Sequence, residues 1–145
     1  DTFNGGFMHV VHMFYVSIQK HLEQSLSKGG EISFSQFLVL IGFYCEEQST
    51  LTQAKLAEYL MLTEATVSRH IGILVTKKLL HKERDGTNKK IYNLTLTEEG
   101  KKTVERSKKI ITESLDTIFK HISEKDKSNI IYSYEKCNRF FNTAK

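Results

Sequence analysis

The 145-residue sequence predicts one mainly helical domain that carries a small β-hairpin. Three observations lead to this fold class. Apolar residues recur at helical spacing near both ends of the chain, a stretch between residues 79 and 97 alternates instead, and the chain contains no proline to interrupt a helix. A hydrophobic content of 39% and a charged content of 26% are ordinary for a folded globular protein.

Two helices are expected before residue 46. In residues 7–26 apolar side chains repeat at helical spacing, and Gly29-Gly30 ends the pattern. Ser33 and Gln36 have the spacing of a capping box, in which each side chain satisfies the other residue's backbone N–H. A second helix therefore begins here and runs to about Cys45.

A pair of shorter helices follows. Thr52 is expected to cap the third helix, and Thr63 to cap a fourth over about 63–77. In the fourth helix an apolar face is expected to bury against the third, and it consists of Val67, Ile71 and Leu74. The opposite face holds four small residues and one arginine, namely Ala65, Ser68, Arg69, Gly72 and Thr76.

Residues 79–84 and 91–97 favour extended structure. In the second run Tyr92, Leu94 and Leu96 alternate with Ile91, Asn93 and Thr95, and the Asp85-Gly86 pair between the runs is a turn signal. A β-hairpin with a basic tip is therefore expected. Thr97 then caps a long helix, and Ser123 caps a final one. The apolar stripe of the long helix is expected to be Val104, Ile111, Leu115, Ile118 and Ile122.

The positive charge of the chain lies in one stretch. The net charge is +4, yet residues 66–92 hold seven basic and two acidic side chains, a net of +5, while the remaining 14 basic and 15 acidic residues leave −1. A lysine-rich solvated surface would explain this cluster, and so would a surface that faces the phosphates of a nucleic acid. The charge alone leaves both interpretations open.

The aromatic residues are distributed in the opposite way. Of 15 Phe and Tyr residues, only Tyr59 and Tyr92 lie between residues 46 and 118. If the two chain ends pack together, they form one large apolar bundle, either as a core or as an oligomer interface. The central segment would then be a separate, lighter module.

The order helix, short turn, helix and β-hairpin is that of a winged helix-turn-helix, whose second helix enters the major groove of DNA. A face of small residues allows close approach to base edges, and Arg69 can form the bidentate pair with guanine. Gly72 inside a helix costs roughly 1 kcal/mol relative to alanine, and close approach to DNA is one compensation. A mere weak point in the helix is the alternative.

Three stretches carry a resemblance to a known family. They are Leu51-Thr52-Gln53 with Leu56-Ala57, then Thr66-Val67-Ser68-Arg69, and finally Leu94-Thr95-Leu96-Thr97-Glu98-Glu99-Gly100. In this order and spacing, residues 32–100 resemble the MarR family of bacterial transcriptional regulators. The flanking helices fit as well, so the resemblance covers nearly the whole chain.

The resemblance implies a homodimer. Residues 1–32 and 101–145 would form a helical dimerisation region, and residues 33–100 a winged helix-turn-helix that binds double-stranded DNA. Many relatives repress from a palindromic operator and release DNA when a small molecule or an oxidant acts. Matching positions make Thr66, Ser68 and Arg69 recognition contacts and Gln53 a phosphate contact. The expected DNA-binding set is Gln53, Ala65, Thr66, Ser68, Arg69, Gly72, Arg84, Lys89 and Lys90.

The sequence departs from the family at two places. The wing usually carries Asp-x-Arg where this chain has Asn88-Lys89-Lys90, and lysine lacks the planar fork of arginine. Phosphate contact by the wing is therefore expected, but minor-groove reading is in doubt. Many relatives also have glycine where Lys78 stands after the recognition helix, so the exit of that helix is expected to differ.

An effector pocket is expected between the dimer helices and the winged module. Aromatic content alone suggests Phe14, Tyr15, Phe37 and Tyr44 as its lining. Cys45 and Cys137 are expected in the core, because free cysteine is among the most buried residue types. A redox-responsive regulator acting through either cysteine remains an alternative.

Other function classes find little support. The motifs of serine hydrolases, phosphate-binding loops and zinc proteases are absent, so no enzyme, cofactor or catalytic residue is expected. His9 and His12 lack further ligands nearby, so no metal site is expected. The longest nearly unbroken apolar run has nine residues, against roughly 20 for a membrane span, and no secretion signal is visible. A cytoplasmic protein is expected, with a winged-helix protein-interaction module as the rival to DNA binding.

Overall fold

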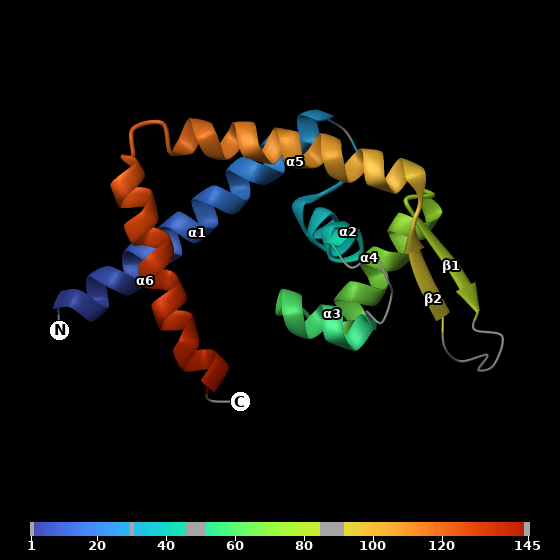
Figure 1. Cartoon of the computed structure of the whole chain (residues 1–145), viewed down its shortest axis with the longest axis horizontal. Helices are drawn as coiled ribbons and strands as arrows, with labels where there is room; N and C mark the ends of the chain where they lie inside the picture. The colour runs from blue at the N-terminus through green and yellow to red at the C-terminus, as the bar shows by residue number, and fades with distance from the viewer. Residues whose placement is uncertain (1, 30, 46–51, 85–91, 144–145) are drawn as a thin grey trace. The chain divides into compact units, whose positions relative to one another are not determined.

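The computed structural model describes residues 2–29, 31–45, 52–84 and 92–143 (Figure 1). Within these ranges it contains six helices and one two-stranded antiparallel sheet, so the predicted fold class is confirmed. The elements are α1 (Thr2–Gly29), α2 (Phe34–Cys45), α3 (Gln53–Leu60), α4 (Glu64–Thr76), β1 (Leu80–Arg84), β2 (Tyr92–Leu96), α5 (Glu98–Ile118) and α6 (Glu124–Thr143).

The chain divides into two compact units, residues 1–114 and 115–145. The first unit holds the elements from α1 to β2 and most of α5. The second holds the end of α5 and all of α6. None of the helices in the described ranges is both long and apolar enough to cross a membrane.

Local capping begins the helices of the first unit as the sequence predicts. Ser33 and Gln36 form the reciprocal capping box of α2, with both N–H to side-chain oxygen distances at 3.1 Å. The hydroxyl of Thr52 accepts the N–H of Lys55, and the hydroxyl of Thr63 accepts the N–H of Thr66, each at 3.1 Å. These bonds satisfy backbone donors that have no partner inside the helix.

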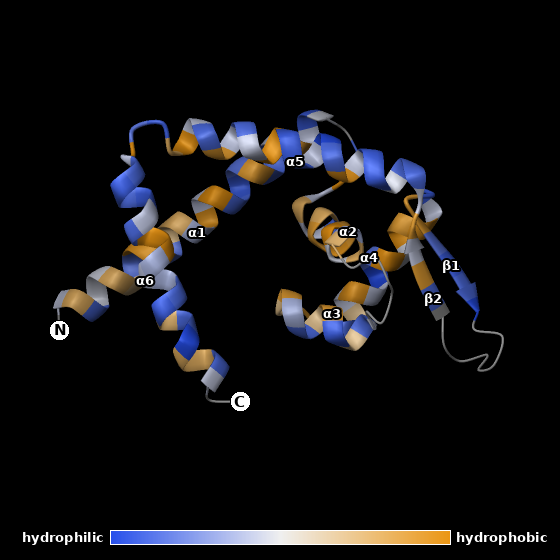
Figure 2. Cartoon of the chain, viewed as in Figure 1, coloured by the Kyte–Doolittle hydropathy of each residue, from blue (hydrophilic) through white to orange (hydrophobic). Residues whose placement is uncertain are grey.

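The hydrophobic core of the first unit lies between α2, α3, α4 and the hairpin. The inner face of α4 is fully enclosed, because Val67, Ile71 and Leu74 are 0%, 1% and 0% exposed. Figure 2 shows α2 almost entirely in the hydrophobic colour, whereas β1 is hydrophilic. The rest of this core is made of Ile32, Phe37, Val39, Leu40, Phe43, Leu56, Ala57, Leu79, Leu80, Leu94 and Val104.

The hairpin pairs its strands in antiparallel register from Leu80 opposite Leu96 to Arg84 opposite Tyr92. Leu80 and Leu94 are buried against the core, while residues 81–84 are exposed. Strand β2 therefore matches the predicted alternation at residues 93–95, whereas β1 buries Leu80 and exposes residues 81–84. The predicted turn at residues 85–86 lies outside the described residues.

The residues that helix α5 buries differ from the predicted apolar stripe. Of the five stripe residues only Val104 is buried, and Ile122 lies beyond the end of the helix with 37% exposure. The other buried positions are small, namely Gly100, Thr103, Ser107 and Ser114. Two of them lie against close neighbours, because the hydroxyls of Ser25 on α1 and Ser114 are 2.8 Å apart and a Cβ at Gly100 would lie 2.2 Å from the carbonyl oxygen of Leu79. Small side chains allow two helix backbones to approach where large apolar ones would hold them apart.

The second unit consists of the end of α5, a turn and α6. The hydroxyl of Ser123 accepts the N–H of Asp126 at 3.1 Å, which confirms the predicted cap. No residue of α6 is buried within the chain.

The prediction that both cysteines lie in the core is wrong, because Cys45 and Cys137 are exposed free thiols. Cys45 is the last residue of α2, beyond its packed face, and Cys137 belongs to the helix that buries nothing within the chain. Their place in the fold thus overrides the usual preference of cysteine for burial.

Candidate nucleic-acid interface

Helices α3 and α4 are joined by a tight turn of the helix-turn-helix type (Figure 1). Met61 adopts the left-handed conformation with φ 55° and ψ 40°, and its N–H donates to backbone carbonyls of α3. The N–H of Leu62 donates to the carbonyl of Ala57 at 2.9 Å. Thr63 then caps α4, so three residues, Met61 to Thr63, connect the two helices.

The outer face of α4 is open to solvent. Arg69 lies on this face, and the other predicted members, Ala65, Ser68, Gly72 and Thr76, are exposed as well. A Cβ added at Gly72 would meet no atom within 4 Å, so packing within the chain does not require glycine there. The structure thus brings the predicted recognition residues together on one unobstructed surface.

Thr66 lies at the amino end of this face and is half-buried. Its hydroxyl accepts a hydrogen bond from the hydroxyl of Thr63 at 2.9 Å. This pair orients the first turn of α4. Gln53 is the first residue of α3, where the positive end of the helix dipole favours a phosphate.

The ring of His70 lies in a more buried environment than the sequence predicts. The sequence suggests a solvated ring or a backbone contact, but Nδ1 is buried and has no hydrogen-bond partner in the described part of the chain. Burial lowers the pKa of His70, and the positive charge of Arg69 lowers it further. The imidazole is therefore neutral at pH 7, and Arg69 supplies the positive charge of the outer face.

The basic cluster is spread over the exit of α4 and the hairpin. Lys78 is exposed after the helix, and Lys82 and Arg84 are exposed on β1. Because strand side chains alternate, Lys82 and Arg84 share one side of β1 with Leu80, and His81 and Glu83 share the other. Nε2 of His81 lies 2.8 Å from Oε1 of Glu83.

Three lysines of the basic cluster differ from its other members, namely Lys77, Lys89 and Lys90. The ammonium of Lys77 donates to the backbone carbonyl of Glu31, so it is directed at the α1–α2 connection rather than at solvent alone. Lys89 and Lys90, the predicted wing contacts, lie outside the described residues. The described positive surface therefore rests on Arg69, Lys78, Lys82 and Arg84.

The four residues predicted to line an effector pocket differ in environment. Phe37 is buried in the core and stacks on Phe34 with ring centroids 6.3 Å apart, whereas Phe14 and Tyr15 are exposed on α1. The ring of Tyr44 on α2 faces the ammonium of Lys108, which lies 5.6 Å from its centroid. An effector pocket with this lining stays a prediction.

The first unit contains a surface pocket at another place than the predicted effector pocket. It is lined by Glu31, Lys77, Leu79, Glu99, Thr103 and Arg106. None of these residues belongs to the predicted lining. Within the described ranges, no three side chains of histidine, cysteine, aspartate or glutamate gather where they could hold a metal ion.

Comparison with known proteins agrees with this architecture. The sequence model described as the MarR family matches residues 31–91. A Staphylococcus aureus MepR–DNA complex is 26% identical, with a TM-score of 0.79, over 92% of this chain and 96% of that one. A MarR transcriptional regulator from Methanosarcina mazei Go1 is 25% identical, with a TM-score of 0.79, over 100% of both chains. No curated protein sequence matches significantly.

A third structure supports the fold alone. It is a cysteine-to-serine mutant of Escherichia coli MarR complexed with operator DNA, 21% identical with a TM-score of 0.79 over 94% of this chain and 98% of that one. The family match covers residues 31–91 and ends before β2, and the structural matches extend to nearly the whole chain. The chain thus resembles the MarR family in sequence over residues 31–91, and it shares the winged helix-turn-helix fold of MarR-family regulators over nearly its whole length.

Proposed function

We propose that this protein is a repressor that binds a palindromic operator as a homodimer and inserts α4 of each protomer into the major groove. One observation carries the proposal. The inner face of α4 is completely enclosed, while its outer face combines small exposed residues with Arg69. A helix with this division can lie against base edges without losing any contact that holds the fold.

The proposed contacts fall into two classes. Ala65, Thr66, Ser68 and Arg69 lie where base edges would be read, and Gly72 allows the backbone of α4 to approach DNA. Gln53, Arg84, Lys89 and Lys90 are proposed as phosphate contacts, which set affinity but not sequence preference. MepR, a relative whose structure includes DNA, supports this assignment because it shares the fold over nearly its whole length.

The homodimer part of the proposal rests on the chain ends. Large apolar residues are exposed on the amino half of α1, including Phe3, Phe7 and Met8, and on α6, including Ile131 and Phe140. A second copy that covers these residues would remove them from water, which is the main driving force of protein association. We assign residues 1–32 and 101–145 to dimerisation and residues 33–100 to DNA binding.

We also propose that a small-molecule effector controls DNA binding. The protein is proposed to be cytoplasmic. An oxidant acting on Cys45 or Cys137 is a second candidate signal, since both thiols are exposed and reactive cysteines must be accessible. Measuring operator affinity before and after peroxide, in the wild type and in a Cys45→Ser/Cys137→Ser variant, tests it. If peroxide still lowers operator affinity in the variant, neither thiol is the oxidant sensor.

The central experiment selects bound duplexes from a random DNA pool and then compares Arg69→Ala with the wild type. We expect Arg69→Ala to lower affinity for the selected site by about 1–3 kcal/mol per half-site and to abolish preference over random duplex. Lys102→Ala removes the same charge from an exposed position on α5 and serves as the control. If Arg69→Ala still prefers the selected site over random duplex, Arg69 does not read the bases of that site.

A further inference from the structure

The chain leaves the recognition helix through a residue in an unfavourable conformation. Lys78 directly follows the cap of α4 and has a φ of 60°, in the left-handed region that side chains other than glycine adopt at a cost. Its N–H donates to the carbonyl of Val75, and the N–H of Leu79 donates to that of Leu74, both at 2.9 Å. Such a conformation persists only where the surroundings hold it.

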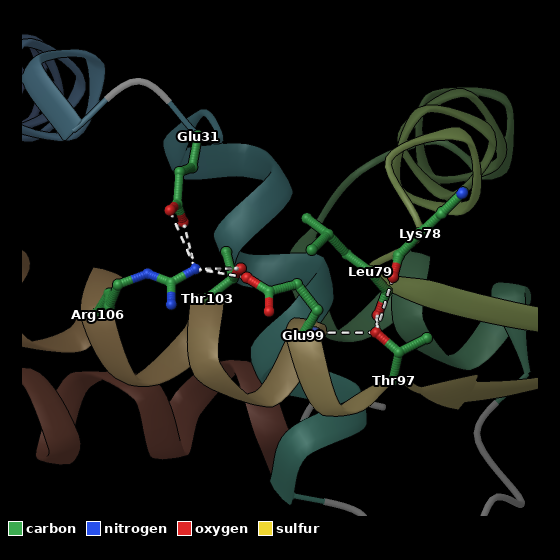
Figure 3. A network of polar contacts seen from close by, with 8 residues as sticks. Glu31, Lys78, Leu79, Thr97, Glu99, Thr103 and Arg106 are labelled. Atoms are coloured by element: carbon green, nitrogen blue, oxygen red, sulfur yellow. Dashed lines mark hydrogen bonds and ion pairs between the residues drawn. The ribbon is translucent and has the colours of Figure 1, made fainter.

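Thr97 supplies part of that support. Its hydroxyl donates to the carbonyl of Lys78 at 2.8 Å and lies 3.1 Å from the carbonyl of Leu79 (Figure 3). The N–H of Thr97 also donates to the carbonyl of Leu79 at 3.1 Å, and its hydroxyl accepts the N–H of Gly100 at 2.9 Å. One residue therefore joins the exit of α4, the end of β2 and the first turn of α5.

The absence of a side chain at Gly100 allows the start of α5 to lie directly against the exit of α4. A Cβ at Gly100 would lie 2.2 Å from the carbonyl oxygen of Leu79 and 2.9 Å from Cδ1 of Leu96. No side chain fits at these distances, so α5 begins in direct backbone contact with the exit of α4. Leu79 and Leu80 beside this contact are both buried. The junction is thus closely packed around Leu79 and Gly100.

A second set of contacts reaches the same junction from the other side. Arg106 of α5 lies 3.0 Å from Glu31 and 2.9 Å from Glu99 (Figure 3). Lys77 also donates to the carbonyl of Glu31. These groups are partly exposed, and exposed ion pairs contribute little to stability. The hydroxyl of Thr97 is therefore the better candidate for setting the geometry.

We propose that Thr97 is a positioning residue for DNA binding, which acts through the carbonyls of Lys78 and Leu79 to set the direction of α4 and of the hairpin relative to the start of α5. The inference rests on the proposed function, because it concerns how two copies of α4 meet one operator. Half-sites lie roughly 34 Å apart, so a small rotation of α4 about its exit would displace both reading faces from the bases.

The test compares Thr97→Val, which has the shape of threonine but no hydroxyl, with Thr97→Ser, which keeps it. We expect Thr97→Val to weaken binding to the selected operator at least tenfold, to change binding to random duplex less than threefold, and to leave the dimer and the helix content unchanged. Thr97→Ser should stay within about twofold of the wild type. Thr95→Val, two residues earlier and exposed on β2, is the matched control.

Amide exchange gives a readout that does not depend on DNA. The N–H of Gly100 loses its acceptor in Thr97→Val but not in Thr97→Ser, so its exchange should accelerate only in the former. If Thr97→Val does not fold, Thr97→Asp replaces it, because a carboxylate caps a helix but has no proton for the carbonyl of Lys78. Thr95→Asp then controls for the added charge.

The outcomes separate this inference from the proposed function. A wild-type protein that prefers no duplex overturns the proposed function and the inference together. A wild type that prefers its operator, with a Thr97→Val variant that binds equally well, overturns the positioning role alone. A loss that equals the fraction of unfolded protein, or that Thr97→Ser shares, also overturns it, since it would show a structural role without control of orientation.

Discussion

Helices α4 and α6 are both amphipathic, but only α4 buries its apolar side within the chain. Val67 and Leu74 of α4 are 0% exposed, whereas Ile131 and Phe140 of α6 are 60% and 70% exposed. The apolar face of α4 is covered by α2 and α3, which contact it directly. In the described structure α6 has no buried residue at all.

This difference separates what one chain can stabilise from what needs a partner. An isolated helix is marginal in water, and most helical stability in proteins comes from packing of an apolar face. Helix α4 obtains that packing from its own chain and can leave its outer face free for DNA. Helix α6 does not, which is the physical basis for assigning it to the dimer interface in the proposed function.

The largest expected effect comes from the covered side of α4. Leu74→Ala should lower the free energy of unfolding by about 2–5 kcal/mol, because it leaves a cavity in a closely packed core. Chemical denaturation measures the loss. Thr76→Ala, on the exposed face of the same helix, should stay within roughly 0.5 kcal/mol of the wild type. Similar losses in the two variants would remove the distinction between the faces.

The uncovered side of α6 provides the second test. Ile131→Asp should raise the dissociation constant of the dimer at least tenfold, because it would place a carboxylate in an apolar interface. Sedimentation over a range of protein concentrations measures this constant. Ser133→Asp, on the opposite face of the same helix, introduces the same carboxylate and is the control, which should leave the constant unchanged. A wild-type protein that is monomeric at micromolar concentration would contradict the dimer assignment itself.

Gly72 sharpens the contrast on α4, because stability and binding should change in opposite directions. Gly72→Ala should raise the free energy of unfolding by about 0.5–1 kcal/mol, since alanine favours the helix and finds open space there. The same methyl group should weaken operator binding if α4 approaches DNA closely. Denaturation and DNA titration of one preparation measure both changes. Unchanged operator affinity would remove Gly72 from the interface.

The smallest expected effect concerns His70. Because burial and Arg69 lower its pKa below 6.5, the unfolded chain binds a proton at higher pH than the folded chain does. The contribution of His70 to stability is therefore present above pH 6.5 and declines as the pH falls through its lowered pKa. Thermal unfolding between pH 7.5 and 5.5 should show a smaller decline in His70→Gln than in the wild type. His81→Gln, which alters an exposed ring, is the control.

Much of the winged module could be predicted from short-range patterns. The caps at Ser33, Thr52 and Thr63, the buried face of α4 and the alternation in β2 depend on residues close together in the chain, and the structure confirms all of them. The exposed recognition face follows from the same helical period. Its role in reading DNA stays a proposal.

Other features could not be predicted because they depend on distant segments. Among the small buried residues of α5, Ser114 meets Ser25 of α1 and Gly100 lies against the carbonyl of Leu79, and neither neighbour is close in the sequence. The expected burial of the cysteines was wrong, because Cys45 lies at the end of α2 and Cys137 belongs to α6, in which no residue is buried. The sequence marked Lys78 as unusual, but not its left-handed conformation or the residue that supports it.

By itself, the sequence determined the order and ends of most elements, the position of the positive charge and the family resemblance. Those properties follow from periodicity and capping, which act within a few residues. Only the tertiary structure decided how the exit of α4 is held, because the carbonyls of Lys78 and Leu79 meet Thr97 almost 20 residues later in the chain. It also decided that Nδ1 of His70 is buried without a partner among the described residues, since burial depends on what packs around the ring.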